Sequence, residues 1–285
     1  KVLKQRARLG AVRLELSNNV SNRFLHYLIE KIGILPKQVY ITRLPFKMDY
    51  VFGLEGQLTE DKALALSYSH FTPQKSPQLD MSQSIIKQIR QKDVVLSYPY
   101  QSMDPFVQLL KEAAVNSSLV SIKITIYRLA SHAKIVEYLC QAAENGKDVT
   151  VIIELRARFD EQNNIDWSER LEEAGCRVIY GFEDYKVHSK VCQITLHDKT
   201  GIHYITQIGT GNYNEKTAKQ YTDISLITAN QAIGSDAALF FKNMAIGKPS
   251  DRYEHFLVSP KYLKSSIIEL INKEIAKGAE GRILL

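Results

Sequence analysis

The stretch LVSIKITIYRLASHAKIVEYLCQAAENGKDVTVIIEL, residues 119–155, decides the fold class. It opens with an apolar run rich in β-branched residues, continues with a helical pattern over 131–147, and closes with a second apolar run over 148–155. Gly146 lies where a helix end favours glycine. Buried strands that alternate with helices are typical of an α/β layer with parallel strands.

The alternation extends to both sides of this stretch. We expect a strand at 94–100 and a helix at 104–116, with Asp104 as its cap and Pro105 at its first position. Downstream, a helix is expected at 164–176 and a strand at 177–181. After residue 186 the pattern changes to strands without helices between them, at 186–197, 202–209 and 221–229, followed by a helix near 230–245.

The two ends of the chain follow other patterns. Residues 12–17, 18–34 and 38–44 predict a strand, an amphipathic helix and a second strand, which together form a small α+β unit. Two prolines in HFTPQKSPQ, residues 70–78, indicate a linker. The pattern therefore predicts a first unit over 1–75, an α/β domain over 76–257, and the start of a further domain over 258–285. Both ends look cut, so we expect a fragment of a longer protein.

Composition describes an ordinary globular protein of 285 residues with a formal net charge of +6. That charge suits a polyanionic partner such as nucleic acid, nucleotide, phosphate polymer or lipid headgroup, but selects none of them. Three cysteines without CxxC spacing fit reduced thiols. No apolar stretch is long enough to span a bilayer, and we expect no signal peptide. We expect a cytoplasmic protein, either free or peripheral at the inner membrane.

KVHSK, residues 186–190, places His188 between two lysines. Strand periodicity would put Lys186, His188, Lys190 and Cys192 on one face and the residues between them on the other. Neighbouring cations oppose protonation, so the ring would stay neutral and nucleophilic. From these residues alone, two interpretations stay open: His188 attacks an anion, or it is a solvated histidine at a strand edge without a chemical role.

A glycine-rich turn, IGTGNYN over 208–214, follows this strand. Its glycines permit close backbone approach to a ligand, and Asn212 offers a short hydrogen-bonding side chain. His-x-Lys followed by Gly-x-Gly-Asn resembles the phospholipase D superfamily pattern of HxK, an Asp, and GSxN. Thr195 stands where that Asp would be, and the sequence lacks a second complete copy of the pattern, although that superfamily builds its site from two halves.

Longer segments widen this resemblance. IKITIYR (122–128), IIELRARFDEQNNIDWSERLEEAGCRVIYG (152–181), KVHSK and IGTGNYNEKTAKQYTD (208–223) closely resemble bacterial polyphosphate kinases of the histidine-phosphorylating type. The resemblance implies a phospholipase D-like αβα sandwich domain behind a partial head domain. It also implies a chain that lacks the family's N-terminal domain and most of the second C-terminal domain.

The family's reaction is reversible transfer of the terminal phosphate of ATP, with Mg²⁺, to inorganic polyphosphate through phosphohistidine. By resemblance His188 is the phosphorylated nucleophile, Lys190 holds a phosphate oxygen, and Tyr221 contacts the nucleotide. Arg128 and Arg158 would grip a phosphate that carries Mg²⁺, because arginine cannot itself ligate a cation. The full-length relatives imply a homo-oligomer with no nucleic-acid partner.

Other polar residues near these motifs have structural or supporting interpretations. Asn212 is expected to shape the turn and contact phosphate, and Asp223 is hypothesised to orient the His188 tautomer. Lys186 is a weaker phosphate-binding candidate. Asp160 and Glu161 resemble an acid/base pair, but a helix cap or a partner for Arg158 is the preferred interpretation, and Cys192 is expected to be a buried thiol.

Two other functions stay open. A phosphodiesterase of the phospholipase D type would use water as the final acceptor and need no ATP. A non-catalytic polyanion-binding module would explain the basic charge but not the histidine within the cationic row. We also expect weak or no polyphosphate synthesis by these 285 residues alone.

Overall fold

The computed structural model describes residues 9–43, 45–69, 71–129, 133–157, 161–248 and 251–284. The chain folds as two compact units, Lys1–Phe71 and Thr72–Leu285. In the described part of the chain, no helix combines the length and the apolar character needed to cross a membrane.

The first unit contains a small βαβ motif. Strand β1 (Leu14–Leu16) pairs in parallel with β2 (Val39–Ile41), and helix α2 (Asn22–Ile32) connects them. The Ser21 hydroxyl accepts from the Phe24 amide at 3.3 Å and begins the helix, and Gly33, at φ 73°, ends it. The remaining elements are η1 (Pro36–Gln38), η2 (Asp49–Gly53), η3 (Glu55–Gln57) and α3 (Glu60–Leu66). The strand–helix–strand order expected from the sequence is confirmed.

The second unit is built on a seven-stranded mixed sheet with the order β3-β9-β8-β7-β4-β5-β6. Strands β4, β5 and β6 are parallel, and all other neighbours are antiparallel. The strand bounds are Val94–Tyr98 (β3), Leu119–Ile126 (β4), Asp148–Ile153 (β5), Arg177–Tyr180 (β6), Val191–Asp198 (β7), Gly201–Gly209 (β8) and Asp223–Thr228 (β9).

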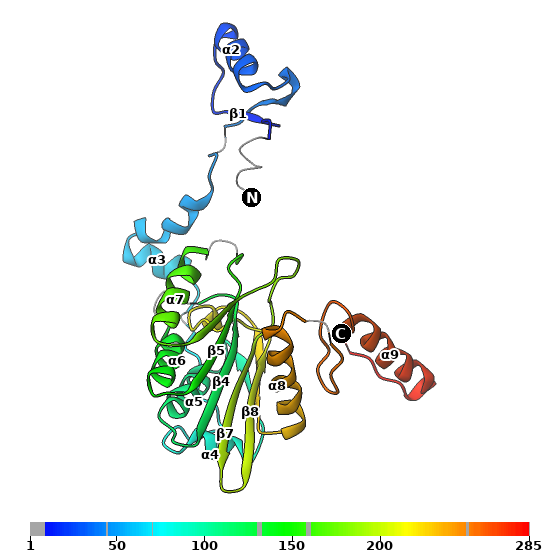
Figure 1. Ribbon diagram of the computed structural model, residues 1–285. Helices are drawn as coiled ribbons and strands as arrows, with labels where there is room; N and C mark the ends of the chain where they lie inside the picture. The colour runs from blue at the N-terminus through cyan, green and yellow to red at the C-terminus, as the bar shows by residue number, and fades with distance from the viewer. Residues whose placement is uncertain are drawn as a thin grey trace. The chain divides into compact units, whose positions relative to one another are not determined.

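Helices cover both faces of this sheet (Figure 1). One face packs against α4 (Ile85–Ile89), α5 (Asp104–Ala114), α6 (Lys134–Glu144) and α7 (Glu161–Glu173), and the other against α8 (Gln231–Ala245). Helix α9 (Leu263–Ala276) and the short η4 (Thr217–Lys219) and η5 (Gly278–Glu280) complete the unit. The αβα sandwich expected from the sequence is confirmed.

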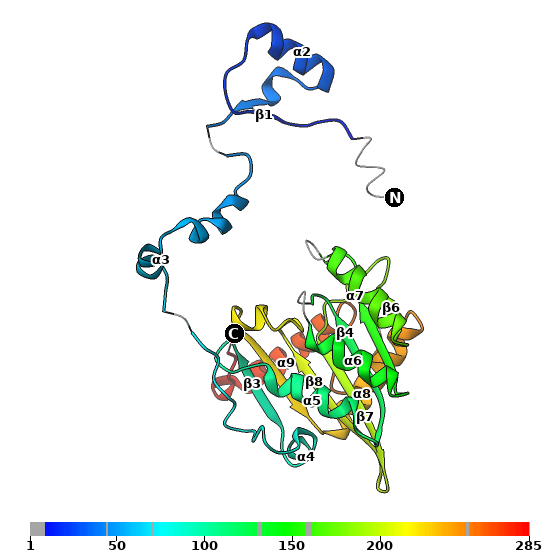
Figure 2. The ribbon, with the colours of Figure 1, turned by 90° about the vertical axis from the view of Figure 1, so that its left-hand side faces the viewer.

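Two local expectations are wrong. The strand at 94–98 does not join the parallel strands, because it pairs antiparallel with β9 at the opposite edge of the sheet, as Figure 2 allows the reader to follow. Asp104 is the first residue of α5 rather than its cap, and Met103 takes the N-cap position. The Asp104 amide instead donates to the Ser102 hydroxyl at 3.1 Å.

Sheet topology brings distant parts of the chain to one edge. Strand β7 runs antiparallel to β4, with Cys192 opposite Ile124, so the start of β7 lies beside the carboxyl ends of β4 and β5. The end of β8 and the start of β9 meet at the same edge, where Gly209 lies opposite Ser225. The carboxyl edge of an open α/β sheet is where such folds place ligands.

Candidate active site

The KVHSK segment is held in place without a strand ladder. The strand expected at 186–197 begins only at Val191, and residues 181–190 belong to no helix or strand. Side chains replace the missing ladder: the Val187 amide donates to Glu154 Oε2 at 2.9 Å, and Thr125 Oγ1 donates to the Ser189 carbonyl at 2.7 Å. The expected alternation still holds, because Cys192 packs into the larger core and Val187 into the core beneath α8.

The imidazole of His188 lies beside the ammonium of Lys190. Lys190 Nζ is 3.0 Å from Nδ1 and 3.2 Å from Nε2 of the ring, and it donates to the His188 carbonyl at 2.6 Å. The exposed ring is lined on another side by Tyr127, at 4.6 Å between centroids and an interplanar angle of 73°. Partial burial, followed by the charges of Lys190, Arg128 and Lys186, lowers the pKa of His188. The ring is therefore neutral at pH 7, as a nitrogen nucleophile must be.

Lys190 is an unusual lysine because only 4% of it is exposed. Burial lowers its pKa to about 8, and the nearby Arg128 charge acts in the same direction, whereas Asp223 opposes the shift. The ammonium also lies 5.4 Å from the centre of the Tyr127 ring. A buried cation with so few anionic partners is well placed to receive an anion.

Arg128 follows β4 and reaches the same edge. Its guanidinium lies 5.7 Å from the centre of the Tyr127 ring, and its charge acts on both His188 and Lys190. Lys186 is more peripheral: its ammonium donates to the Arg156 carbonyl at 3.3 Å. Arg128, Lys186 and Lys190 thus give the histidine a cationic surrounding.

The glycine-rich turn closes the site from the β8–β9 side. The Gly209 amide donates to the Lys190 carbonyl at 2.9 Å. A Cβ on Gly211 would come within 2.7 Å of the Asp223 carboxyl carbon, so glycine is required by close approach there. In the part of the chain that the structure describes, Oδ1 of Asn212 is buried and accepts no hydrogen bond, a feature that costs about 1–3 kcal/mol and calls for an explanation such as a ligand.

Asp223 contacts the turn rather than the histidine. Its Oδ1 accepts from the Thr210 hydroxyl at 2.7 Å, and its charge acts on Lys190. Among the hydrogen bonds of the described residues, none joins Asp223 to the His188 ring. Any influence of Asp223 on the tautomer would therefore pass through Lys190, and that role stays a prediction.

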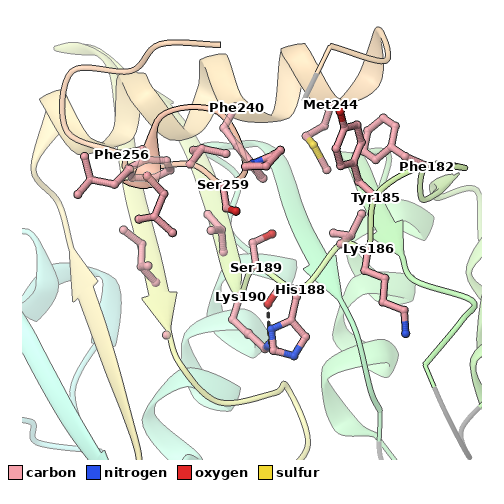
Figure 3. Close-up of a pocket in the computed structure, with 18 of the residues that line it drawn as sticks. Phe182, Tyr185, Lys186, His188, Ser189, Lys190, Phe240, Met244, Phe256 and Ser259 are labelled. Atoms are coloured by element: carbon pink, nitrogen blue, oxygen red, sulfur yellow. Dashed lines mark hydrogen bonds between the residues drawn. The ribbon is translucent and has the colours of Figure 1, made fainter. Parts of the chain in front are cut away.

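A pocket of about 760 Å³ opens beside His188 and Lys190 (Figure 3). Lys186, His188 and Lys190 line it from the segment before β7, whereas the opposite wall includes Phe240 and Met244 of α8. Segment 255–260 completes the wall. Figure 3 shows Lys190 folded back against the imidazole ring. The imidazole ring and Lys190 point away from Phe240 and Met244 in this view, and Arg128, Asn212 and Tyr221 do not line the pocket.

The remaining predicted residues are placed as follows. Tyr221 is 61% exposed, next to η4, so it is not a core residue. Cys192 is buried as expected, and burial raises the pKa of its thiol. Arg158 and Asp160 lie outside the described residues, as does the side chain of Glu161.

Four residues of the site were not predicted from the sequence: Thr125, Tyr127, Glu154 and Arg156. Thr125 is fully buried and Glu154 is 1% exposed. Both are polar residues that lie within or directly after an apolar strand. This pattern could have identified them from the sequence. A polar side chain in a buried parallel strand needs a partner, and here the partner is the backbone around His188.

The side chains near His188 offer few of the oxygen ligands that Mg²⁺ requires. Among the described residues, no group of three or more His, Cys, Asp and Glu side chains could hold a metal ion. Magnesium prefers oxygen ligands in an octahedral arrangement and commonly arrives with substrate phosphates. The described residues therefore do not form a magnesium site built by the protein alone.

The chain matches a family model described as "Polyphosphate kinase C-terminal domain 1" over residues 84–249. It is 37% identical over 281 residues to the polyphosphate kinase of Rhodopirellula baltica, covering 99% of this chain and 33% of that protein. It is also 37% identical over 287 residues to that of Staphylococcus epidermidis, covering 99% of this chain and 39% of the relative. The chain therefore spans about a third to two fifths of the length of these relatives.

A solved structure gives the same result. The crystal structure of polyphosphate kinase from Porphyromonas gingivalis superposes with a TM-score of 0.68 at 36% identity, covering 79% of this chain and 38% of that one. Since the family model covers more than half of the 285 residues, and the shared fold places His-x-Lys and Gly-x-Gly-Asn at one sheet edge, the chain belongs to the polyphosphate kinase family.

Proposed function

We propose that the chain takes part in reversible transfer of the terminal phosphate of ATP to inorganic polyphosphate, with His188 as the phosphorylated group. The observation that supports this most is the contact between a neutral, exposed imidazole and the buried ammonium of Lys190, at 3.0 and 3.2 Å. A neutral ring can attack phosphorus, and the neighbouring cation offsets the charge of the phosphoryl oxygens.

The step is a displacement at phosphorus. The unprotonated ring nitrogen of His188 forms an N–P bond to the terminal phosphoryl group, and the bond from that phosphorus to the bridging oxygen breaks. ADP leaves with the electron pair of the broken bond. In the second half, the terminal oxygen of a polyphosphate chain attacks the same phosphorus and the N–P bond breaks, which regenerates the imidazole.

The other residues bind and orient. Lys190 and Arg128 would hold oxygens of the transferring group, and Arg158 would join them as a second guanidinium. Asn212 would contact phosphate from the turn, and Tyr221 would stack on the adenine. Mg²⁺ would arrive on the nucleotide phosphates near the two arginines, and no step is assigned to it.

The proposal extends to the organisation of the chain. Residues 1–75 would form part of a head domain, 76–257 the first phospholipase D-like domain, and 258–285 the start of the next. ATP as substrate and three buried free thiols fit a cytoplasmic protein, and the full-length form would be a homo-oligomer. We expect weak or no polyphosphate synthesis by the 285 residues alone, because the second histidine-bearing half would be needed.

The experiment is labelling from two donors. Full-length wild type, His188→Ala and His197→Ala are incubated with Mg²⁺ and either γ-labelled ATP or labelled polyphosphate, and acid-labile, base-stable label on the protein is counted. His197 lies on β7 and is the matched control. We expect label from both donors on wild type and His197→Ala, and none on His188→Ala.

Other outcomes would overturn the proposal. Label that survives His188→Ala would place the nucleophile elsewhere. Absence of label from both donors would favour a polyanion-binding module. Hydrolysis of a phosphodiester without ATP, lost in His188→Ala, would favour the phosphodiesterase.

A further inference from the structure

The segment that delivers His188 to the site has no secondary structure of its own. Ten residues, 181–190, separate β6 from β7 and carry both lysines and the histidine. A segment without a ladder would sample many conformations unless other groups fix its backbone. Its backbone partners therefore determine where the imidazole ring lies.

Arg156 binds three carbonyls of this segment. Its Nη1 donates to the Glu183 carbonyl at 2.9 Å, and its Nη2 donates to the carbonyls of Phe182 at 2.6 Å and Tyr185 at 2.7 Å. A guanidinium presents several donors in a rigid plane, so one side chain can gather three carbonyls. The ammonium of lysine is a compact point charge and cannot span the same set.

Glu154 fixes both Arg156 and the segment. Its Oε1 accepts from the amide of Arg156 at 2.9 Å and from Nε of Arg156 at 3.3 Å, while Oε2 accepts from the Val187 amide at 2.9 Å. The Glu154 side chain is 2% exposed, and buried carboxylates persist only when paired and hydrogen-bonded. The carboxylate thus joins the end of β5 to the residue directly before His188.

A third contact fixes the chain on the other side of the histidine. Thr125 Oγ1 donates to the Ser189 carbonyl at 2.7 Å and accepts from the Val191 amide at 3.1 Å. His188 therefore lies between two anchored points, one supplied by β5 and one by β4. Displacement of a reacting group by about 1 Å can cost about 100-fold in rate, so the anchors control the geometry of the ring.

We propose that Glu154 and Arg156 are a positioning pair for His188, which hold residues 182–187 so that the imidazole lies against Lys190 and Tyr127. The pair does not touch the reacting atoms, and its importance for phosphoryl transfer rests on the proposed function. The effect of the pair on the position of the ring does not depend on that function.

The test uses Arg156→Gln, Arg156→Lys and the control Arg90→Lys in the full 285-residue chain. Arg90 also binds a carboxylate, since its Nη1 lies 3.1 Å from Asp198 Oδ2, but it contacts the far end of β7. Histidine-selective NMR follows the titration of each imidazole, with His188→Gln identifying the His188 signal. Thermal unfolding establishes that each variant is folded. The labelling rate is measured at several ATP concentrations with the same substitutions in the full-length protein.

In wild type, burial and the charges of Lys190, Arg128 and Lys186 keep the pKa of His188 below its ordinary value. Release of the segment in Arg156→Gln takes the ring away from these cations, so the pKa rises toward that value. We expect the rate constant of labelling at saturating ATP to fall by about 10- to 100-fold, with little change in the ATP concentration that gives half of that rate. Arg156→Lys preserves the charge, so its His188 pKa and labelling rate should lie between those of wild type and Arg156→Gln. Arg90→Lys should match wild type in both.

A wild-type titration of His188 in folded Arg156→Gln would overturn the proposal, whatever the labelling rate. The two proposals fail separately. If wild type takes no label but the His188 titration shifts in Arg156→Gln, the positioning pair stands and the proposed function fails. If folding of Arg156→Gln is lost, Arg156→Lys provides the same comparison, and an unshifted titration in it would overturn the proposal.

Discussion

The two compact units of this chain use amphipathic sequence in different ways. In the second unit, the apolar faces of α5, α6 and the central strands are buried in one continuous core. In the described part of the first unit, Ile34 is the single buried apolar side chain, at 5% exposure, whereas Phe24 on α2 is 47% exposed. Helices of both units show the same amphipathic pattern. The pattern therefore predicts which face of a helix can be buried, but not whether that face is buried in the folded chain.

This difference locates the rigid part of the molecule. A buried core holds the carboxyl ends of β4 and β5 and the start of β7 in fixed relation, and the candidate site lies at that edge. Phosphoryl transfer needs fixed positions for the nucleophile and the cations. The comparison predicts that substitutions in the two units have unequal effects on stability and on the site.

Leu110→Ala should give the largest effect. Leu110 on α5 is fully buried, so its truncation leaves a cavity and should lower the free energy of unfolding by about 2–5 kcal/mol. Phe24→Ala in the first unit should cost about 1 kcal/mol or less. Urea unfolding followed by fluorescence measures the loss in the second unit, where the only tryptophan, Trp167, lies, and circular dichroism follows the unfolding of both units. Equal losses for the two variants, seen by circular dichroism, would remove the distinction between the units.

Lys190→Met should give a pH-dependent effect. The pKa of Lys190 is lowered from 10.5 to about 8, so between these values the unfolded chain binds more protons than the folded one. Stability therefore rises with pH across this window, by roughly 3 kcal/mol for this group, and the penalty is fully present below pH 8. In Lys190→Met, the free energy of unfolding should lose this contribution to its rise with pH.

The control for that measurement is Lys37→Met, which removes an exposed lysine of the first unit. Its unfolding free energy should follow wild type at every pH between 8 and 10.5. If wild type and Lys190→Met gave parallel curves, Lys190 would not be desolvated in solution and the electrostatic description of the site would be wrong.

Tyr221→Ala should give the smallest change in stability and a measurable change in binding. The side chain is 61% exposed, so its removal should alter the free energy of unfolding by about 0.5 kcal/mol or less. Loss of an aromatic ring that stacks on a base should weaken binding of ATP about tenfold, whereas Tyr221→Phe should bind normally. Calorimetric titration with Mg²⁺ and ATP measures the affinity.

Tyr68→Ala is the matched variant in the first unit, because Tyr68 is fully exposed. It should leave affinity and stability unchanged. Unchanged affinity in Tyr221→Ala would exclude stacking by Tyr221, and a loss in Tyr68→Ala would bring the first unit into the nucleotide site.

The sequence by itself determined the element types, the αβα sandwich and the family. Apolar runs with period 2 or 3.6, together with glycines at helix ends, are local signals, and Gly146 and Gly175 have the positive φ of 76° and 90° that such ends require. His188, Lys190 and the Gly-x-Gly-Asn turn were found because they form contiguous motifs.

Only the tertiary structure decided which groups surround the histidine. Strand order is a long-range property, so nothing local indicated that β3 pairs with β9 or that the start of β7 lies beside the ends of β4 and β5. The contacts of Arg156 were not predictable for the same reason, because its three carbonyl partners lie 26 to 29 residues away in the sequence. Burial decided the chemistry of Lys190, because the pKa of an amine depends on its access to water and to neighbouring charges, which a sequence does not record.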